Sequence, residues 1–307
     1  MLFWRKESPE KAQHELIARA ERLTAAGKDR QALALLRQLP AEIFAHLLLE
    51  PPAATPALRA MLPSMASDDA QRHWTGASGA LLMSQSLDFM RAVDAASREH
   101  LGHGISGKVL DYGCGWGRLL RLLLWYVDPD RIYGVDPWDQ SLSMCRQHNC
   151  PGQLALCDYV PSSLPFTECF DLIYAFSVFT HLSERTADAV LRVLSSHISS
   201  KGMLVITIRP PEYWKAHGAW RAGYSAEGML QQHEQHGFAF VPHELDAIDG
   251  DITYGDTSMT LDFLRHRWPD WKIVGTAHNA NDPLQLLVFM LPACIHQETS
   301  GTDHDCF

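Results

Sequence analysis

The apolar residues of this chain repeat with different periods in different regions. Up to about residue 63 they recur every three or four positions, as in "ELIARAERLTAAGKDRQALALLRQL", which predicts amphipathic helices with a stop at Gly27. A second helical stretch covers roughly 79–99. Between 108 and 209, short continuous apolar runs such as "MLVITI" alternate with helical segments, which indicates strands that are buried on both faces.

The alternating region predicts a doubly wound parallel sheet, because strands that alternate with helices favour an α/β fold. We expect strands at 108–112, 131–136, 153–157, 170–176 and 202–208, with helices at about 117–127, 139–148 and 184–199. A short helix at 258–268 and strands at 271–278 and 284–291 complete the pattern.

The stretch 210–255 interrupts this alternation and is rich in aromatic residues and histidines. Its residues Tyr213, Trp214 and Trp220 could form the wall of a binding pocket, or equally the core of a small lobe. Beyond 292 the apolar period ends, so 293–307 is expected to be a mobile tail.

Composition narrows the class of protein. The chain has 307 residues and a formal net charge of −10, and no basic stripe is visible, which argues against nucleic acid as a partner. Its seven cysteines include no C-x-x-C pair, which argues against a zinc site and a disulfide framework. The apolar runs are too short to span a bilayer. We therefore expect reduced thiols, no membrane partner and a cytoplasmic location.

The segment "VLDYGCGWGRLL" (109–120) places three glycines behind the first strand. Its G-x-G-x-G spacing, over Gly113, Gly115 and Gly117, departs from the dinucleotide pattern G-x-G-x-x-G, because Arg118 stands where that pattern requires glycine. Asp111, just ahead of the turn, would serve a pyrophosphate poorly and a positive amino group well. Both features argue against the alternative of a nicotinamide-dependent oxidoreductase.

Two further acids follow neighbouring strands. Asp136 ends the second strand, where open parallel sheets bind ligands, and its carboxylate can accept two hydrogen bonds from a ribose diol. Asp158 follows the third strand, in a position to meet an adenine amino group. Either acid alone could be a turn residue, but with Asp111 they indicate one adenosyl-ligand site.

Four stretches, "VLDYGCGWGRLLRLL", "IYGVDPWDQSL", "FDLIYAFSVFTHLSE" and "GMLVITI", resemble the class I S-adenosylmethionine-dependent methyltransferases. The resemblance covers roughly 105–210, and more weakly extends to 292. It implies a Rossmann-like seven-stranded sheet of order 3-2-1-4-5-7-6 whose last strand is antiparallel, with 271–278 as the sixth strand and 284–291 as the seventh. The methyltransferase domain would then span 101–292, behind an N-terminal helical extension over 1–100. The stretch 210–255 would be an insertion at the rim of the active site, where Tyr213, Trp214 and Trp220 could line the acceptor.

The resemblance also implies S-adenosylmethionine as cofactor and a role for each candidate residue. The glycine turn would lie under the methionine portion, which Asp111 would face through water or backbone, and Asp136 would bind the ribose hydroxyls. The remaining cofactor contacts would be Trp138, Asp158 and Tyr159 around the adenine, and Phe176 and Ser177 along the methionine side. Trp74 could reach the cofactor from the N-terminal helices, or could simply be a buried tryptophan at a helix start.

A hydroxyl acceptor would also need a general base, and His181 in "VFTHL" lies just past the fourth strand, where an acceptor would sit. The alternative is a packing or capping histidine ahead of Ser183, which we expect to begin the next helix. His217 and His233 are weaker candidates. Arg118 and Arg121 are expected to be surface or capping charges, and no metal-site pattern is present.

The sequence therefore predicts a methyltransferase that acts on a small-molecule or glycan acceptor by in-line displacement. The alternative is a catalytically silent protein that binds S-adenosylmethionine or S-adenosylhomocysteine as a scaffold. The N-terminal helices could cap the site, recruit a partner or pair two copies as a homodimer. Whether oxygen, nitrogen or carbon is methylated stays open.

Overall fold

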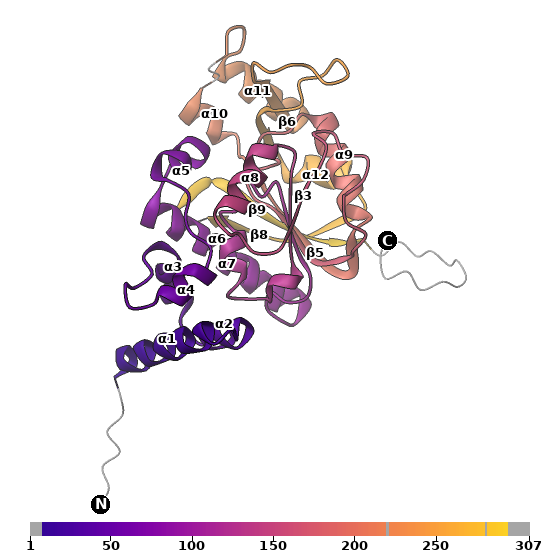
Figure 1. Ribbon diagram of the computed structural model, residues 1–307. Helices are drawn as coiled ribbons and strands as arrows, with labels where there is room; N and C mark the ends of the chain where they lie inside the picture. The colour runs from indigo at the N-terminus through magenta and orange to yellow at the C-terminus, as the bar shows by residue number, and fades with distance from the viewer. Residues whose placement is uncertain (1–7, 219–220, 280, 294–307) are drawn as a thin grey trace, which may run out of the picture.

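The computed structural model describes residues 8–218, 221–279 and 281–293, in which a central sheet is flanked by helices (Figure 1). The helices are α1 (Pro9–Ala25), α2 (Asp29–Leu36), α3 (Ala41–Leu49), α4 (Pro56–Met61), α5 (Asp68–Thr75), α6 (Gly79–Leu101), α7 (Leu120–Leu123), α8 (Asp139–Gln147), α9 (Glu184–Ser195), α10 (Glu212–His217), α11 (Ala226–His236) and α12 (Leu261–Arg267), with a 3-10 turn at Pro129–Arg131. The strands are β1 (Val109–Tyr112), β2 (Ile132–Asp136), β3 (Gln153–Leu156), β4 (Phe170–Ala175), β5 (Ile198–Ile208), β6 (Phe238–Pro242), β7 (Gly255–Met259), β8 (Trp271–Asn279) and β9 (Asp282–Pro292).

The main sheet has seven strands in the order β3-β2-β1-β4-β5-β9-β8. The first five are parallel, and β9 runs antiparallel to both β5 and β8. The predicted order and the predicted antiparallel last strand are confirmed. Because β9 is antiparallel, with Leu286 opposite Ile208, its first residues lie at the edge where the parallel strands end.

Two apolar layers cover the sheet. On one face, α6, α7 and α8 pack with the N-terminal helices in a single cluster, to which α6 contributes Phe89 and Val93. On the other face, α9 and α12 supply Val190, Leu194 and Leu264. The serine predicted to begin α9 does so, because Ser183 Oγ accepts a hydrogen bond from the backbone N–H of Thr186.

The N-terminal helices, at the lower left in Figure 1, contact the sheet region partly through one arginine. Arg37 follows α2, and its guanidinium donates to the carbonyl oxygens of Leu124 (2.9 Å) and Val127 (2.6 Å) and to the carboxylate of Asp128 (2.7 Å). The two carbonyl oxygens follow α7, where the last C=O groups of a helix have no intrahelical partner, so Arg37 supplies the hydrogen bonds that they lack. The helices predicted for the N-terminal region are thus packed against the sheet rather than set apart from it.

Several predicted elements differ from those observed. The helix expected at 117–127 is reduced to the four residues of α7, and Arg121 explains part of this, because its Nη1 occupies the carbonyl oxygens of Trp116 and Gly117 that a longer helix would use. The strand expected at 202–208 begins earlier, at Ile198. The segment 210–255 carries α10, α11 and β6, grouped at the top in Figure 1, and β6 pairs with β7 in a second sheet that was not predicted.

Two findings bear on the predicted environment. Cys169, just ahead of β4, is disulfide-bonded, so the expectation of reduced thiols is wrong at this position, while Cys114, Cys145, Cys150 and Cys157 are free.

Within 8–218, 221–279 and 281–293, no helix has both the length and the apolar character needed to cross a membrane. The predicted tail falls almost wholly in 294–307, outside the described residues.

We predict that Arg37→Met lowers the free energy of unfolding by about 1–3 kcal/mol, because it leaves two carbonyl oxygens and a carboxylate without their donor. The matched control is Arg30→Met. Arg30 also bonds an aspartate, Asp130, but both side chains are mostly exposed, and such a pair contributes at most about 1 kcal/mol. Urea unfolding of both variants measures the difference. Equal losses would contradict the anchoring role given to Arg37.

Candidate cofactor and acceptor sites

The glycine turn between β1 and α7 has a backbone that other residues would strain. Gly113, Gly115 and Gly117 all have positive φ, at 74°, 54° and 80°. A Cβ on Gly113 would come within 2.5 Å of Val178 Cγ2, and one on Gly117 within 2.6 Å of Cys150 Sγ. The turn is therefore closely packed from both sides, and its conformation and its space both require glycine.

Asp136 holds this turn in place from the end of β2. Its Oδ2 accepts the backbone N–H of Gly115 at 2.8 Å, and its Oδ1 accepts from Trp138 N–H at 2.9 Å and Ser141 Oγ at 3.0 Å. Burial raises the pKa of Asp136, and these hydrogen bonds oppose the rise. Three of about four acceptor positions on the carboxylate are used, which leaves room for one further donor.

Asp111 lies on the neighbouring strand β1, 2% exposed. Burial raises the pKa of its carboxyl well above the ordinary value, and the nearby charge of Asp136 adds to the rise, while the hydroxyl of Tyr174 and the charge of Arg118 oppose it. A carboxyl buried in this way is stabilised by a cationic ligand group. The predicted place for the cofactor's amino group has the electrostatics that such a group requires.

The adenine-side candidates lie at the outer edge of the turn. Trp74 of α5 stacks on Trp138, with ring centroids 4.7 Å apart and an interplanar angle of 21°. The Trp74 ring also lies 3.7 Å from where a Cβ on Gly115 would be. Asp158 and Tyr159 follow β3 and are exposed. The N-terminal extension thus brings an aromatic ring directly onto the glycine turn.

The exit from β4 has a strained backbone. Ser177 has φ 58°, a conformation that costs of order 1–3 kcal/mol outside glycine. It is held by Thr207 Oγ1, which accepts its backbone N–H at 2.7 Å, and by Gln285 Nε2, which donates to its Oγ at 3.0 Å. Phe176 packs against Phe89 of α6, with ring centroids 4.6 Å apart. Phe176 and Ser177 therefore have fixed positions beside the turn.

His181 does not have the geometry of a general base. Its Nδ1–H donates to the carbonyl oxygen of Gly255 at 2.7 Å, and its Nε2 accepts from Arg209 Nη2 at 3.0 Å. Burial, followed by the Arg209 charge, lowers the pKa of His181 to about 3. The ring is neutral near pH 7 and its lone pair already accepts a hydrogen bond. This arrangement favours the packing alternative, and the proton-accepting role stays a prediction that it does not support.

His181 belongs to what we call the rim cluster, which consists of His181, Arg209, His243, Tyr254 and Asp256. Arg209, at the end of β5, donates from Nη1 to Asp256 Oδ1 at 2.6 Å. Tyr254 stacks on the His181 ring at 4.9 Å and 6°, and His243 Nε2 lies 3.5 Å from Asp256 Oδ2. The cluster joins the exits of β4 and β5 to the inserted segment, beside the position predicted for the acceptor.

Three of these residues have the spacing of metal ligands. Each of the three, His181, His243 and Asp256, offers one ligand atom. These three atoms all lie within 4.8 Å of one another. However, the guanidinium of Arg209 is bonded to both His181 and Asp256, and Nδ1 of His181 carries a proton toward Gly255. A divalent ion would have to displace a positive charge that is already bonded there. The chemistry of this donor set therefore fits an arginine-centred cluster better than a metal centre.

The aromatic residues proposed for the acceptor wall have different positions. Tyr213 lies under Arg209, whose Cζ is 4.0 Å from its ring centroid. Trp214 is fully buried, and its Nε1–H donates to Ser258 Oγ at 2.6 Å, so its predicted contact with substrate is wrong and it belongs to the core of the inserted lobe. Trp220 lies outside the described residues. His233 is buried against the same Ser258, and the exposed His217 packs on Tyr213.

Three polar residues at this edge were not predicted from the sequence to lie near the site. Arg118, expected at the surface, is partly buried over the Phe176 ring. Asp282 and Gln285 begin β9 and lie beside the β4 and β5 exits only because β9 is antiparallel. Gln285 is 8% exposed, and within the part of the chain that the structure describes its Oε1 has no hydrogen-bond partner. A glutamine inside the apolar run "LQLLVFML" was the one signal available for it.

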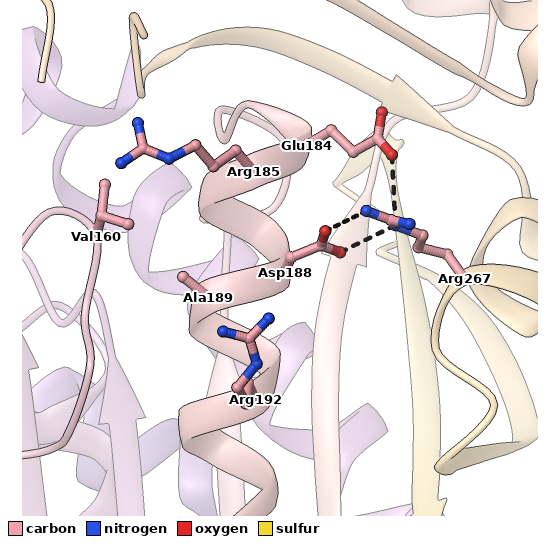
Figure 2. Close-up of a pocket in the computed structure, with 7 residues that line it drawn as sticks. All are labelled: Val160, Glu184, Arg185, Asp188, Ala189, Arg192 and Arg267. Atoms are coloured by element: carbon pink, nitrogen blue, oxygen red, sulfur yellow. Dashed lines mark hydrogen bonds and ion pairs between the residues drawn. The ribbon is translucent and has the colours of Figure 1, made fainter. Parts of the chain in front are cut away.

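A groove of about 580 Å³ lies elsewhere, along the outer side of α9 (Figure 2). It is lined by Val160, Glu184, Arg185, Asp188, Ala189, Arg192 and Arg267. Figure 2 shows Arg267 bonded to both Glu184 and Asp188. None of the predicted site residues borders this groove, and its acids are already neutralised, so we place the candidate site at the strand ends instead.

Part of the chain matches a known family. Residues 109–202, which include the glycine turn, Asp136 and the rim residue His181, match the family model described as a methyltransferase domain. None of the curated proteins compared with the chain matches it.

Two solved structures show the same fold. One is an S-adenosylmethionine-dependent methyltransferase from Clostridium acetobutylicum, 12% identical, with 73% of this chain and 97% of that chain covered and a TM-score of 0.50. The other is DesVI from Streptomyces venezuelae, 14% identical, with 75% and 100% covered and a TM-score of 0.50. The chain therefore carries a methyltransferase domain on the fold of the S-adenosylmethionine-dependent enzymes.

We predict that His181 stays neutral, protonated on Nδ1, from pH 8 to about pH 4.5, because its pKa lies far below the ordinary value of about 6.5. Nitrogen-15 NMR of the imidazole measures this directly. The unfolded chain takes up a proton on His181 below pH 6.5 while the folded chain does not, so this residue lowers stability as the pH falls. His181→Gln should lose that component. An imidazole that titrates near pH 6.5 would contradict the assignment.

Proposed function

We propose that this methyltransferase binds S-adenosylmethionine across the strand ends and transfers its methyl group to a small-molecule or glycan acceptor beside the rim cluster. The observation that carries the proposal is the arrangement of Asp111, the glycine turn and Asp136 on adjacent strands. This arrangement offers a buried acid, a backbone that a ligand can approach closely and a second acid fixed 2.8 Å from Gly115 N–H. Each feature has a matching group on the cofactor.

The residues present offer a partner to the amino group, the ribose and the adenine of the cofactor. Asp111 would face its amino group, and the remaining acceptor position of Asp136 would take a ribose hydroxyl. Trp138 is 44% exposed and Tyr159 46%, so both offer ring surface to an adenine. Trp74 is in contact with Gly115 and stacked on Trp138, so it would border the bound nucleoside from the N-terminal side.

The rim cluster would receive the acceptor. Tyr254 is 38% exposed and is held parallel to His181, so it presents a fixed aromatic face on which a sugar or another ring could pack. Arg209 and His243 add polar groups beside it. The net charge of −10 disfavours a nucleic-acid acceptor.

Bound S-adenosylmethionine supplies the activated methyl group on its sulfonium sulfur. An acceptor group in line with the carbon–sulfur bond would take that methyl group, and a hydroxyl or amino acceptor would lose its proton to solvent. The protein's own contribution would be alignment and exclusion of water, which supply much of such a rate enhancement. His181 would position Arg209 rather than take a proton. A cytoplasmic location and pairing of two copies through the N-terminal helices stay predictions.

We predict that S-adenosylhomocysteine stabilises the protein against thermal unfolding and that NAD does not. At one hundred times its dissociation constant, a ligand specific for the folded state adds about 2.7 kcal/mol. Differential scanning calorimetry with each compound measures the shift. Stabilisation by NAD alone would reverse the assignment of cofactor.

Methyl transfer itself needs a separate measurement. Incubation with methyl-labelled S-adenosylmethionine and a panel of amino sugars, glycosides and small phenols should label at least one acceptor. Tyr254→Ala, which removes the exposed ring, is expected to reduce labelling without abolishing the thermal shift by S-adenosylhomocysteine. Labelling of nucleic acid but of no small molecule or glycan would contradict the acceptor class.

A further inference from the structure

Arg118 is the first residue after the glycine turn and reaches across to α6. Its Nε–H donates to Ser86 Oγ at 2.7 Å, and its Nη2 has a long contact of 3.5 Å with the carbonyl oxygen of Leu82. The guanidinium carbon lies 5.1 Å from the centroid of the Phe176 ring. The charged group is thus held between α6 and the exit from β4.

This cation differs from Arg37 and Arg209, which each bond an aspartate, at 2.7 Å and 2.6 Å. Among the described residues, no carboxylate lies within ion-pair distance of Arg118, and its Nη1 has no hydrogen-bond partner. Asp111 and Asp282 act on it only at longer range. Arg121 is also without an ion pair, but three backbone carbonyl oxygens accept hydrogen bonds from it. A charged group with as few partners as Arg118 would be stabilised by an anionic ligand group.

The adjacent ends of β4 and β9 also carry a buried polar atom without a hydrogen-bond partner among the described residues. Tyr174 and Leu287 belong to the apolar layer on the α6 side of the sheet, and side chains alternate along a strand, so Phe176 and Gln285 project to that same side. Gln285 holds Ser177 through Nε2 and leaves its buried Oε1 without a donor. This edge of the sheet therefore carries one cation, Arg118, and one hydrogen-bond acceptor, Gln285 Oε1, that has no donor among the described residues.

We propose that Arg118 binds the α-carboxylate of the cofactor's methionine portion. This inference rests on the proposed function. It adds a residue that binds the carboxylate end of the cofactor, for which the sequence predicted no contact. The free α-amino acid is a zwitterion, and the site would match it with the acid Asp111 for the ammonium group and Arg118 for the carboxylate. A guanidinium binds a carboxylate with two charge-assisted hydrogen bonds when its geometry allows.

The competing interpretation is purely structural, since Arg118 also ties the turn to α6 through Ser86. The two roles differ in the ligands they affect. A carboxylate-binding residue matters only for ligands that carry the carboxylate. A structural residue matters for every ligand that uses the turn.

The experiment is isothermal titration calorimetry with two probes, S-adenosylhomocysteine and 5′-methylthioadenosine, which shares the adenosyl thioether but lacks the amino-acid end. For Arg118→Gln we expect the affinity for S-adenosylhomocysteine to fall about 10- to 100-fold, as the loss of a hydrogen-bonded charge partner implies. The affinity for 5′-methylthioadenosine should stay within about twofold. Arg118→Lys, which keeps the charge, should recover part of the loss.

The matched control is Ser86→Ala, which removes the α6 contact of Arg118 and keeps the guanidinium. It should leave the ratio of the two affinities unchanged. Equal weakening of both probes by Arg118→Gln, or no weakening of either, overturns the inference while the proposed function stands. If wild-type protein binds neither probe, the proposed function fails, and the inference fails with it. Circular dichroism of each variant verifies that it is folded.

Discussion

The hydrogen bond from Gly115 N–H to the carboxylate of Asp136 is the interaction on which the site depends. It crosses from the end of β2 to the turn after β1, at 2.8 Å, and the other oxygen of the same carboxylate begins α8 through Trp138 and Ser141. One buried acid therefore fixes the positive-φ turn, the end of one strand and the start of one helix. The parallel pairing of β1 with β2 brings these groups together. The proposed nucleoside site is a consequence of this pairing.

Charge is arranged differently on the two sides of the site. Around the turn, acids dominate and burial raises the pKa of Asp111, which favours a cationic ligand. At the rim, Arg209 neutralises Asp256 and supplies the hydrogen bond that keeps His181 neutral. The first side suits the cofactor's ammonium and sulfonium groups. In the rim cluster, the charges are already paired with one another. A neutral acceptor could therefore bind there without contacting an unpaired ion.

Local pattern was sufficient for strands β1 to β4 and for the turn. Continuous apolar runs located β1 to β4 within about a residue, because they depend on neighbours in sequence. The strand order came from the resemblance of four stretches to a known family. The second sheet, β6 with β7, was missed because β7 contains Asp, Thr and Ser and lacks a continuous apolar run. The hydrogen bonding of His181 could not be predicted from the sequence either. Its protonation depends on Arg209, which is remote in sequence.

The central claim is that the nucleoside of the cofactor lies over the glycine turn and is anchored at Asp136. A crystal structure of the protein soaked with S-adenosylhomocysteine tests it most directly. The account predicts electron density above Gly113 to Gly117, with the ribose hydroxyls at Asp136 and the adenine against Trp138. Density in the groove beside α9, with the turn left clear, would contradict it.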